Sequence, residues 1–266
     1  MARERLEIFR FQRLADLGVP HGITRREPSL PSDGDVSFAT AGSPSAVRHN
    51  RQRWWAAMGL DWRRTVCGRQ VHGTRVMLVS ERDAGRGADS PATALPATDG
   101  LASSDPALPI AVLCADCAPV LLYDPVNRVA AAVHAGWRGT VAGIAIEAVR
   151  LLVSEFGTDP GQLRAGIGPA IGPCCYEVGD EVIETWIGTQ LDRGLRAVIR
   201  HDGRWHFDLW RANLSTLEAA GLIASNVEIA GICTRCRSSE WFSHRATQAG
   251  ESRAGRFAAV IAVPAG

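Results

Sequence analysis

Two histidines and one cysteine lie beside turn residues at the expected ends of apolar strands. His72 occurs in "RQVHGTRV", Cys117 ends "PIAVLCADC", and His134 ends "RVAAAVHA" just before Gly-Trp-Arg-Gly. Two imidazoles and one thiolate form a suitable zinc-ligand set that leaves one coordination position open for water or substrate. We therefore predict a shared metal site. Because spacing alone does not bring the three side chains together, ordinary packed or surface residues remain the alternative.

Arg138 follows His134 in "GWRGT", at the expected N-terminus of a helix. Backbone N–H groups, the helix dipole and a guanidinium all favour an anion at such a position. The alternative is a surface arginine that caps a turn. The chain contains no lysine, so all 29 of its Lys and Arg residues are arginine. This excludes a Schiff-base lysine and a Walker-type lysine.

The cysteines form two C-x-x-C pairs, "CADC" (Cys114, Cys117) and "CTRC" (Cys233, Cys236). In zinc ribbons such pairs usually lie about 15–20 residues apart, whereas these are widely separated. We do not expect one zinc site to combine them. Neither pair opens a helix after a strand, so a thioredoxin-like redox pair is not expected either. Core packing is the simple interpretation of Cys67, Cys114 and Cys233.

The stretch 166–179, "GIGPAIGPCCYEVG", is rich in glycine but lacks the spacing of a dinucleotide-binding loop. It predicts either a tight loop between a strand and a helix or a wall of a small-molecule pocket. His201 and His206 flank an expected hairpin turn, and His244 is a weak candidate. His21 lies either near a site or on a polar surface.

The elements that would position these residues are mixed in type. Apolar runs predict strands within 71–81, 226–233 and 256–263, and adjacent buried strands with a hairpin over 110–135. Helical periodicity and end signals predict helices within 43–60, 140–157, 178–191 and 207–221. Residues 82–100 are expected to form a long surface loop. This pattern favours a layered α+β or α/β domain over a doubly wound fold.

Composition limits the classes of function. The chain has 266 residues, of which 46% are hydrophobic and 21% charged, and its net charge is +1. A bulk electrostatic case for binding nucleic acid or a membrane is therefore absent. No signal-peptide or membrane-spanning run is visible. With an odd number of cysteines, seven, this predicts a protein of the reducing cytoplasm.

Several motifs together resemble one family. "QVHG", "ATDGL", "CADCAPVLLYDP", "AAVHAGWRGT", "IGPAIGPCCYEVG" and "WFSHR" occur here in the order typical of the laccase-domain, or multicopper polyphenol oxidase, family. That family is also called YfiH-like or peptidoglycan-editing-factor-like. The resemblance implies one domain over residues 1–266, a sandwich of mixed β-sheets flanked by helices, related to cytotoxic necrotizing factor. It also implies a metal held by His72, Cys117 and His134.

The resemblance further implies a purine nucleoside phosphorylase for adenosine, inosine, guanosine and methylthioadenosine, with adenosine deaminase activity. Purine nucleoside and phosphate would be its partners, and zinc its metal, with copper as the alternative. We expect His72, Cys117, His134 and Arg138 to be catalytic and Arg138, then Arg69, to bind phosphate. His244 stands where the family commonly has tyrosine, which bears on nucleoside selectivity.

Three other functions remain open: a hydrolase that edits peptidoglycan precursors, a copper polyphenol oxidase, and a non-catalytic metal- or nucleoside-binding protein. The oxidase is the weakest on physical grounds. A multicopper oxidase needs many histidine ligands, and the seven histidines here are scattered singly without His-x-His pairs. The sequence leaves the oligomeric state open, with a monomer as one option.

Overall fold

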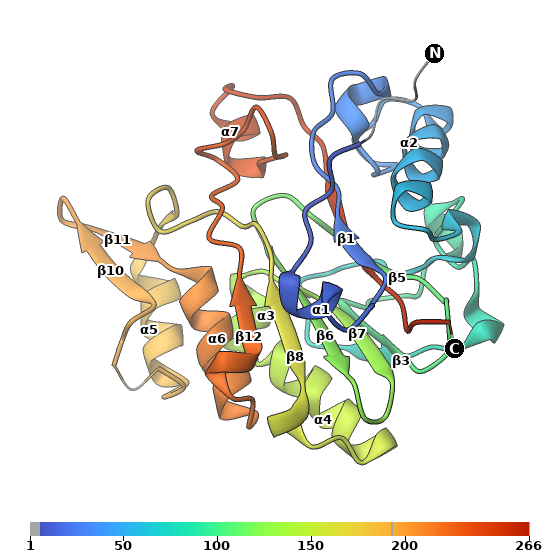
Figure 1. Ribbon diagram of the computed structural model, residues 1–266. Coiled ribbons are helices and arrows are strands. Elements are labelled where there is room, and N and C mark those ends of the chain that lie inside the picture. Colours follow the sequence, from blue (N-terminus) through green and yellow to red (C-terminus); the bar gives the residue numbers. More distant parts are fainter. Residues whose placement is uncertain (1–5, 193, 266) are drawn as a thin grey trace.

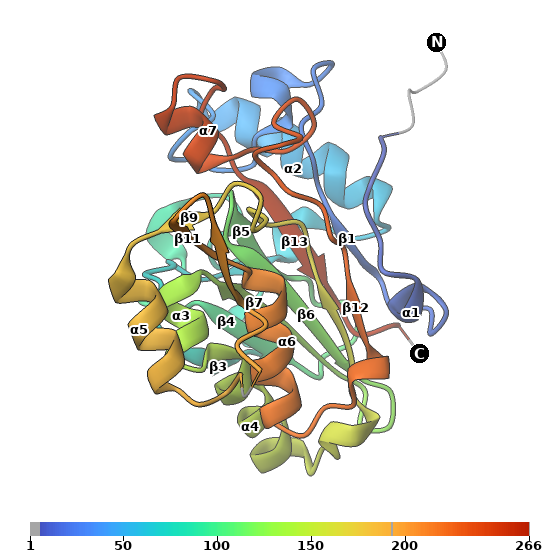
Figure 2. The ribbon, with the colours of Figure 1, turned by 90° about the vertical axis from the view of Figure 1, so that its left-hand side faces the viewer.

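The protein is layered, with two β-sheets packed face to face between helices, in a computed structural model that describes residues 6–192 and 194–265. Figures 1 and 2 show helices α3, α4 and α6 on one side of this pair and helix α2 on the other. The architecture is α+β. It agrees with the predicted layering of mixed sheets between helices and excludes a doubly wound fold.

The larger sheet has six strands and contains most of the motif-bearing segments. Their order across the sheet is β12 (Val227–Ile229), β8 (Arg164–Ile167), β6 (Ala118–Asp124), β7 (Val129–Ala135), β4 (Gly100–Ser103) and β3 (Val76–Leu78). Strands β6 and β7 form the predicted antiparallel hairpin. Both strands are buried along their whole length. Their sequences are therefore continuous apolar runs and do not alternate between apolar and polar residues.

The smaller mixed sheet has the order β1 (His21–Ile23), β13 (Phe257–Ile261), β5 (Ile110–Cys114) and β2 (Val66–Cys67). Here the prediction over 110–135 was partly wrong. Strand β5 does not pair with β6, because the chain crosses from one sheet to the other within residues 115–117. A run of three apolar strands carries no signal for such a crossing.

Successive side chains of strand β7 point to opposite faces of the six-stranded sheet, and they pack into two different cores. Val129, Ala131 and Val133 belong to the core between the six-stranded sheet and its helices. Ala130 and Ala132 belong to the core between the two sheets. Small side chains on this second face let the two sheets approach closely. A third core, which includes Trp54 and Trp55 of α2, covers the outer face of the smaller sheet.

The helices begin and end near the predicted signals. Ser43 caps α2 by accepting from the Ala46 N–H, and Asp208 caps α6 by accepting from two backbone N–H groups. The described helices are α1 (Gln12–Ala15), α2 (Pro44–Ala57), α3 (Trp137–Val141), α4 (Ile144–Phe156), α5 (Asp180–Gly188), α6 (Leu209–Ala219) and α7 (His244–Gln248).

Two predicted elements differ from the structure. The helix expected over 140–157 starts earlier, at Trp137, and is divided into α3 and α4 by Gly143, whose φ is +84°. Its predicted end is right, since Gly157 closes α4 in the left-handed conformation. The strand expected over 71–81 is reduced to β3, Val76–Leu78, so that His72 lies in a loop before it.

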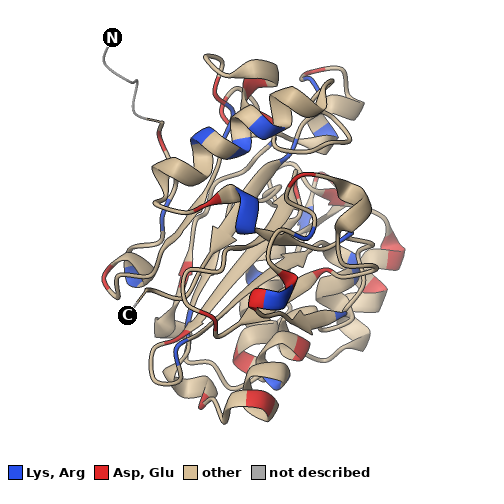
Figure 3. Ribbon diagram, turned by 90° about the vertical axis from the view of Figure 1, so that its right-hand side faces the viewer, with Lys and Arg blue, Asp and Glu red and all other residues tan. Residues whose placement is uncertain are grey.

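A three-stranded antiparallel sheet of β9 (Glu177–Val178), β11 (Arg204–Phe207) and β10 (Val198–His201) lies beside helix α5. Its β10–β11 hairpin is the one predicted between His201 and His206. On the face seen in Figure 3, acidic and basic residues are interspersed over the ribbon. Within the described residues, no helix is both long and apolar enough to cross a membrane.

Candidate metal centre and cavity

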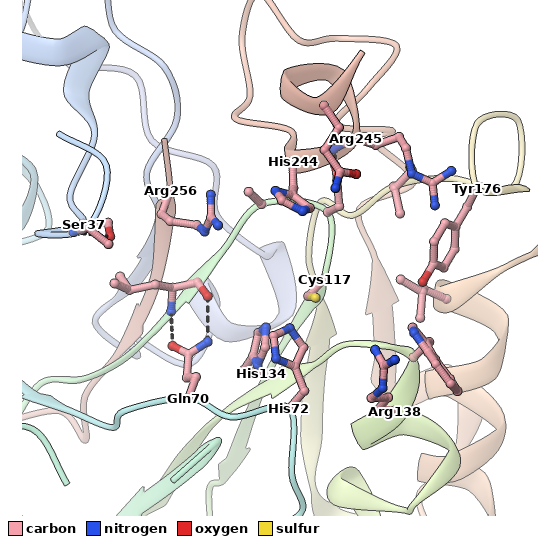
Figure 4. Close-up of a pocket in the computed structure, with 18 of the residues that line it drawn as sticks. Ser37, Gln70, His72, Cys117, His134, Arg138, Tyr176, His244, Arg245 and Arg256 are labelled. Atoms are coloured by element: carbon pink, nitrogen blue, oxygen red, sulfur yellow. Dashed lines mark hydrogen bonds between the residues drawn. The ribbon is translucent and has the colours of Figure 1, made fainter. Parts of the chain in front are cut away.

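The structure brings His72, Cys117 and His134 together. One ligand atom from each lies within 4.8 Å of the other two, and the two imidazole rings have centroids 4.9 Å apart. In Figure 4 the two rings stand side by side below the sulfur of Cys117. Two of the three positions differ from the prediction, because Cys117 immediately precedes β6 rather than ending a strand and His72 lies in a loop. His134 is on β7, as expected.

Asp99 organises two of these three residues. Its carboxylate accepts hydrogen bonds from the backbone N–H groups of Val71, His72 and Gly73 at 2.9–3.0 Å. The same carboxylate lies 2.9 Å from Nδ1 of His134. With Nδ1 occupied in this way, His134 presents Nε2 to Cys117. A carboxylate behind a histidine is the usual outer partner of a metal-binding imidazole, because it fixes the orientation of the ring.

The backbone at Gly136 lies very close to the side chains of Cys117 and His72. A Cβ on Gly136 would lie 2.8 Å from Sγ of Cys117 and 3.1 Å from the ring of His72. Glycine is therefore required directly after β7 if both side chains are to converge. His72 itself has φ of +62°, an uncommon conformation for a non-glycine residue. The Asp99 carboxylate holds its N–H in place and stabilises this conformation.

The electrostatics favour a thiolate at Cys117. Burial alone would raise the pKa of Cys117, but His134 and His72 outweigh burial and lower its pKa to about 6. Burial would likewise lower the pKa of His134, but the neighbouring Cys117 and Asp99 raise it to about 9. Near neutral pH these shifts give a thiolate beside an imidazolium, so a cation would bind the thiolate directly and would displace the proton from the ring of His134.

The three residues line a cavity of about 730 Å³. Both predicted phosphate ligands, Arg69 and Arg138, also line it. Two further arginines that the sequence analysis missed, Arg245 and Arg256, do so as well. Among residues 6–192 and 194–265, no carboxylate oxygen lies within 4.0 Å of any of these four guanidinium groups. The cavity therefore combines a group of potential metal ligands with several unpaired cations, which suits an anionic ligand.

Arg138 is the second residue of α3, and its guanidinium lies 4.4 Å from the ring centroid of Trp137. Figure 4 shows it pointing up toward Tyr176 on the opposite side of the cavity from Arg256. Arg245 in turn lies 5.4 Å from the centroid of the Tyr176 ring. The cations thus surround the cavity rather than forming one patch.

Asp116 is another residue of the site that was not predicted from the sequence. It accepts from the hydroxyl of Thr234 and the backbone N–H of Arg245, both at 2.6 Å. It thereby ties the crossing between the sheets to the C-terminal segment that carries Arg245. Its place between the two cysteines of "CADC" was the available signal. Arg245, Arg256 and Tyr176 come from distant segments, and no local pattern indicates that they meet.

The remaining candidates are distributed as follows. Residues 166–179 contribute Ile171 and Tyr176 to the cavity wall, which favours the pocket-wall interpretation of that loop. His244 also lines the cavity. His21 is neither near the site nor at the surface: it is 1% exposed, it lies 2.8 Å from the carbonyl oxygen of Val19, and its Nε2 accepts from the Phe11 N–H. His206 contacts the carbonyl of Pro173.

The two C-x-x-C pairs are separate, as expected. Cys114 is buried in β5 and Cys117 belongs to the group with the histidines. Cys233 and Cys236 instead meet Cys174 and Cys175 from the glycine-rich loop. The adjacent pair "CC" was the signal for this second group.

Comparison with known proteins agrees with this picture. The family model for multi-copper polyphenol oxidoreductase laccase matches residues 21–264. The purine nucleoside phosphorylase YlmD of Geobacillus stearothermophilus is 38% identical over 202 residues, covering 75% of this chain and 73% of that protein. A protein named adenosine deaminase RL5, from an unknown prokaryote, is 36% identical over 190 residues, covering 71% of this chain and 72% of its own.

The fold is shared as well. The crystal structure of YlmD from Geobacillus stearothermophilus matches with a TM-score of 0.91 and 31% identity, over 99% of this chain and 98% of that one. The resemblance predicted from the motifs is thereby confirmed. The chain belongs to the multi-copper polyphenol oxidoreductase laccase family.

Proposed function

We propose that this protein is a zinc-dependent purine nucleoside phosphorylase that also deaminates adenosine. The observation that carries the proposal is the cavity itself, in which the group of His72, Cys117 and His134 faces arginines that have no carboxylate partner among the described residues. The names of the relatives, purine nucleoside phosphorylase and adenosine deaminase, support the substrate class. We extend it to adenosine, inosine, guanosine and methylthioadenosine.

The donor set fits zinc. Two imidazoles and one thiolate are borderline and soft ligands of the kinds found in zinc enzymes, which use three protein ligands and keep a fourth position open. His72, Cys117 and His134 would hold the ion, and Asp99 would orient His134 behind it. When bound, zinc supplies Lewis acidity and lowers the pKa of a coordinated water.

The other cavity residues provide for substrate. Phosphorolysis requires phosphate to be held for attack on the anomeric carbon of the ribose while the purine leaves with a proton. Arg138 and Arg69 are the phosphate ligands that we assign, because a guanidinium can bind phosphate oxygens with two parallel hydrogen bonds. Ile171 and Tyr176 offer an apolar wall for the purine. His244 has ring nitrogens able to donate the proton.

Deamination uses the same cavity without phosphate. The purine carbon that bears the amino group must reach the open side of the His72–Cys117–His134 group, where water replaces phosphate as the second reactant and ammonia leaves with the proton it gains. The similarity to the relative named adenosine deaminase supports this second activity. Because we assign Arg138 to phosphate and deamination uses none, changes at Arg138 should separate the two reactions.

A copper polyphenol oxidase is not favoured by the site. Multicopper oxidation needs a blue copper site and further histidine ligands nearby. In the described part of the chain, the group containing His72 is accompanied by one other group of potential metal ligands, and that group contains cysteines alone.

The direct test is product analysis of metal-quantified protein with adenosine, with and without phosphate. We expect adenine and ribose 1-phosphate only when phosphate is present, and inosine in both cases. A protein with zinc bound that converts adenosine under neither condition would refute the proposal. Release of an amino acid from a nucleotide-linked muramyl precursor would then assign the editing hydrolase, and binding without turnover a non-catalytic role.

A further inference from the structure

A second group of potential metal ligands lies outside the catalytic trio. Cys174, Cys175, Cys233 and Cys236 each place Sγ within 4.8 Å of the other three. We propose that these four cysteines bind a second zinc ion, as a closed structural site that joins the glycine-rich loop to the C-terminal segment. The proposal does not depend on the enzymatic activity.

The sulfur separations suit a tetrahedral ion. A Zn–S bond of about 2.3 Å corresponds to about 3.8 Å between sulfurs in a tetrahedron. Sγ of Cys236 lies 3.4 Å from that of Cys174 and 3.3 Å from that of Cys175, and no separation in the group exceeds 4.8 Å. The two short separations lie about 0.5 Å below the tetrahedral value, and the 4.8 Å limit on the others lies above it, so small side-chain rotations would complete the site. They also exceed the roughly 2.05 Å of a disulfide bond.

The backbone already presents the sulfurs. The N–H groups of Gly172 and Cys236 point at Sγ of Cys233, at 3.2 and 3.5 Å, and such donors stabilise a thiolate. Cys174 and Cys175 lie in a tight turn in which the carbonyl of Gly172 accepts from the N–H groups of Cys175 and Tyr176. The contact from the Cys236 N–H closes the C-x-x-C turn around the sulfur of Cys233, and the sulfur of Cys236 lies in the same group.

The two segments that carry the cysteines run side by side. Strands β8 and β12 are parallel neighbours (Figure 1), and the pairing continues beyond them as a bridge between Ala170 and Cys233. Beyond this bridge the segments reach the margin of the core, where Cys233 is buried, Cys175 is half-buried, and Cys174 and Cys236 are exposed. A metal bound there would join the exposed part of both segments to the buried part.

A zinc ion here would hold the wall of the cavity. Tyr176 follows Cys175 directly and lines the cavity. Thr234, between Cys233 and Cys236, donates to Asp116, which in turn accepts from the N–H of Arg245. The site would therefore fix the spacing between Tyr176 and Arg245 without contacting substrate, which is a positioning role.

The test uses the full-length Cys117→Ala variant, in which the trio has lost its thiolate. After loading with cobalt(II) and removal of excess metal, we expect one bound equivalent with the intense charge-transfer absorption of several thiolates. The further change Cys236→Ser should remove that absorption, whereas Cys114→Ala, at a buried cysteine outside both groups, should retain it. Zinc analysis of the Cys117→Ala variant as purified should likewise give one equivalent.

Three results would overturn the proposal: no retained metal in Cys117→Ala, copper in place of zinc as the purified metal, or a disulfide among the four cysteines found by thiol counting. Because exposed Cys236 can be replaced with little packing loss, misfolding is not expected. In the otherwise natural chain, Cys236→Ser should lower the melting temperature and raise KM for nucleoside more than it lowers kcat. Loss of adenosine turnover in every form, with the cobalt result intact, would refute the proposed function alone.

Discussion

The two groups of potential metal ligands in this protein differ in composition and in surroundings. The group of His72, Cys117 and His134 combines nitrogen and sulfur donors, has Asp99 behind it, and faces a cavity of about 730 Å³. The group of Cys174, Cys175, Cys233 and Cys236 has sulfur donors alone and lies where two segments meet near the surface.

The difference indicates a division of roles. Three ligands with an open side leave room for a reactant, whereas four thiolates fill a tetrahedral ion completely. The charges follow the same division, since four arginines line the cavity of the first group. The first group therefore suits chemistry and the second suits positioning, and each prediction below tests one side of that contrast.

The largest expected effect comes from Cys117→Ala. Loss of the only thiolate in the trio should remove its metal and with it several kcal/mol of transition-state stabilisation, reducing kcat/KM about 10³-fold or more. Zinc content and steady-state rates with adenosine measure the effect. Cys114→Ala, three residues earlier and buried in β5, is the matched control and should keep both metal and activity.

A smaller loss is expected from Asp99→Asn. The amide keeps one oxygen but cannot accept from Val71, His72, Gly73 and His134 together. Loss of an outer partner of this kind typically reduces metal affinity or activity about 10–100-fold. Competition with a chelator measures the affinity.

Asp124→Asn provides the control for Asp99→Asn. Asp124 is also fully buried and accepts from two backbone N–H groups and the Thr158 hydroxyl, but at the other end of the β6–β7 hairpin. The Asp124→Asn substitution should lower the stability of the fold and leave the metal affinity unchanged. Equal losses of metal affinity in the two variants would remove the special role of Asp99.

Arg138→Met should separate the two proposed reactions. A hydrogen bond to a charged group contributes about 1.5–3 kcal/mol, so KM for phosphate should rise about 10–100-fold while deamination without phosphate changes little. Arg150→Met, in an exposed ion pair with Glu147, is the control. An unchanged KM for phosphate would move the anion site to the other arginines of the cavity.

The smallest effect is a pH dependence of the metal-free protein. The pKa of Cys117 is lowered from 9.0 to about 6, so its contribution to stability is complete above pH 9 and is lost as the pH falls through 6. The pKa of His134 is raised from 6.5 to about 9, so its contribution is complete below pH 6.5 and is lost as the pH rises through 9.

The thiolate–imidazolium pair should therefore stabilise the metal-free protein most between about pH 6 and 9. The difference in melting temperature between the natural chain and Cys117→Ala, both without metal, should be largest in that window. A difference that does not change with pH would show that the pair is not ionised.

Much of the fold was predictable because its signals are local. The cap at Ser43, the end of α4 at Gly157 and the β6–β7 hairpin follow from residues next to one another in sequence. The crossing of the chain between the two sheets at residues 115–117 was not predictable, because β5 and β6 have the same apolar character. Which strands pair depends on distant contacts that no single run encodes.

The candidate site shows the same limit. The types and turn positions of His72, Cys117 and His134 suggested a metal site, although two of the three do not end a strand as expected. Asp99 could be related to them only through its hydrogen bonds to backbone N–H groups and to His134. The convergence of Arg245, Arg256 and Tyr176 depends on the packing of separate segments.

The contrast between the two groups is tested most directly by one experiment: measurement of zinc content and phosphate-dependent adenine release in parallel for the natural chain, Cys117→Ala and Cys236→Ser. We expect two zinc ions in the natural chain and one in each variant, with kcat abolished only in Cys117→Ala. Full turnover by Cys117→Ala without metal in the trio would contradict the assignment of chemistry to His72, Cys117 and His134.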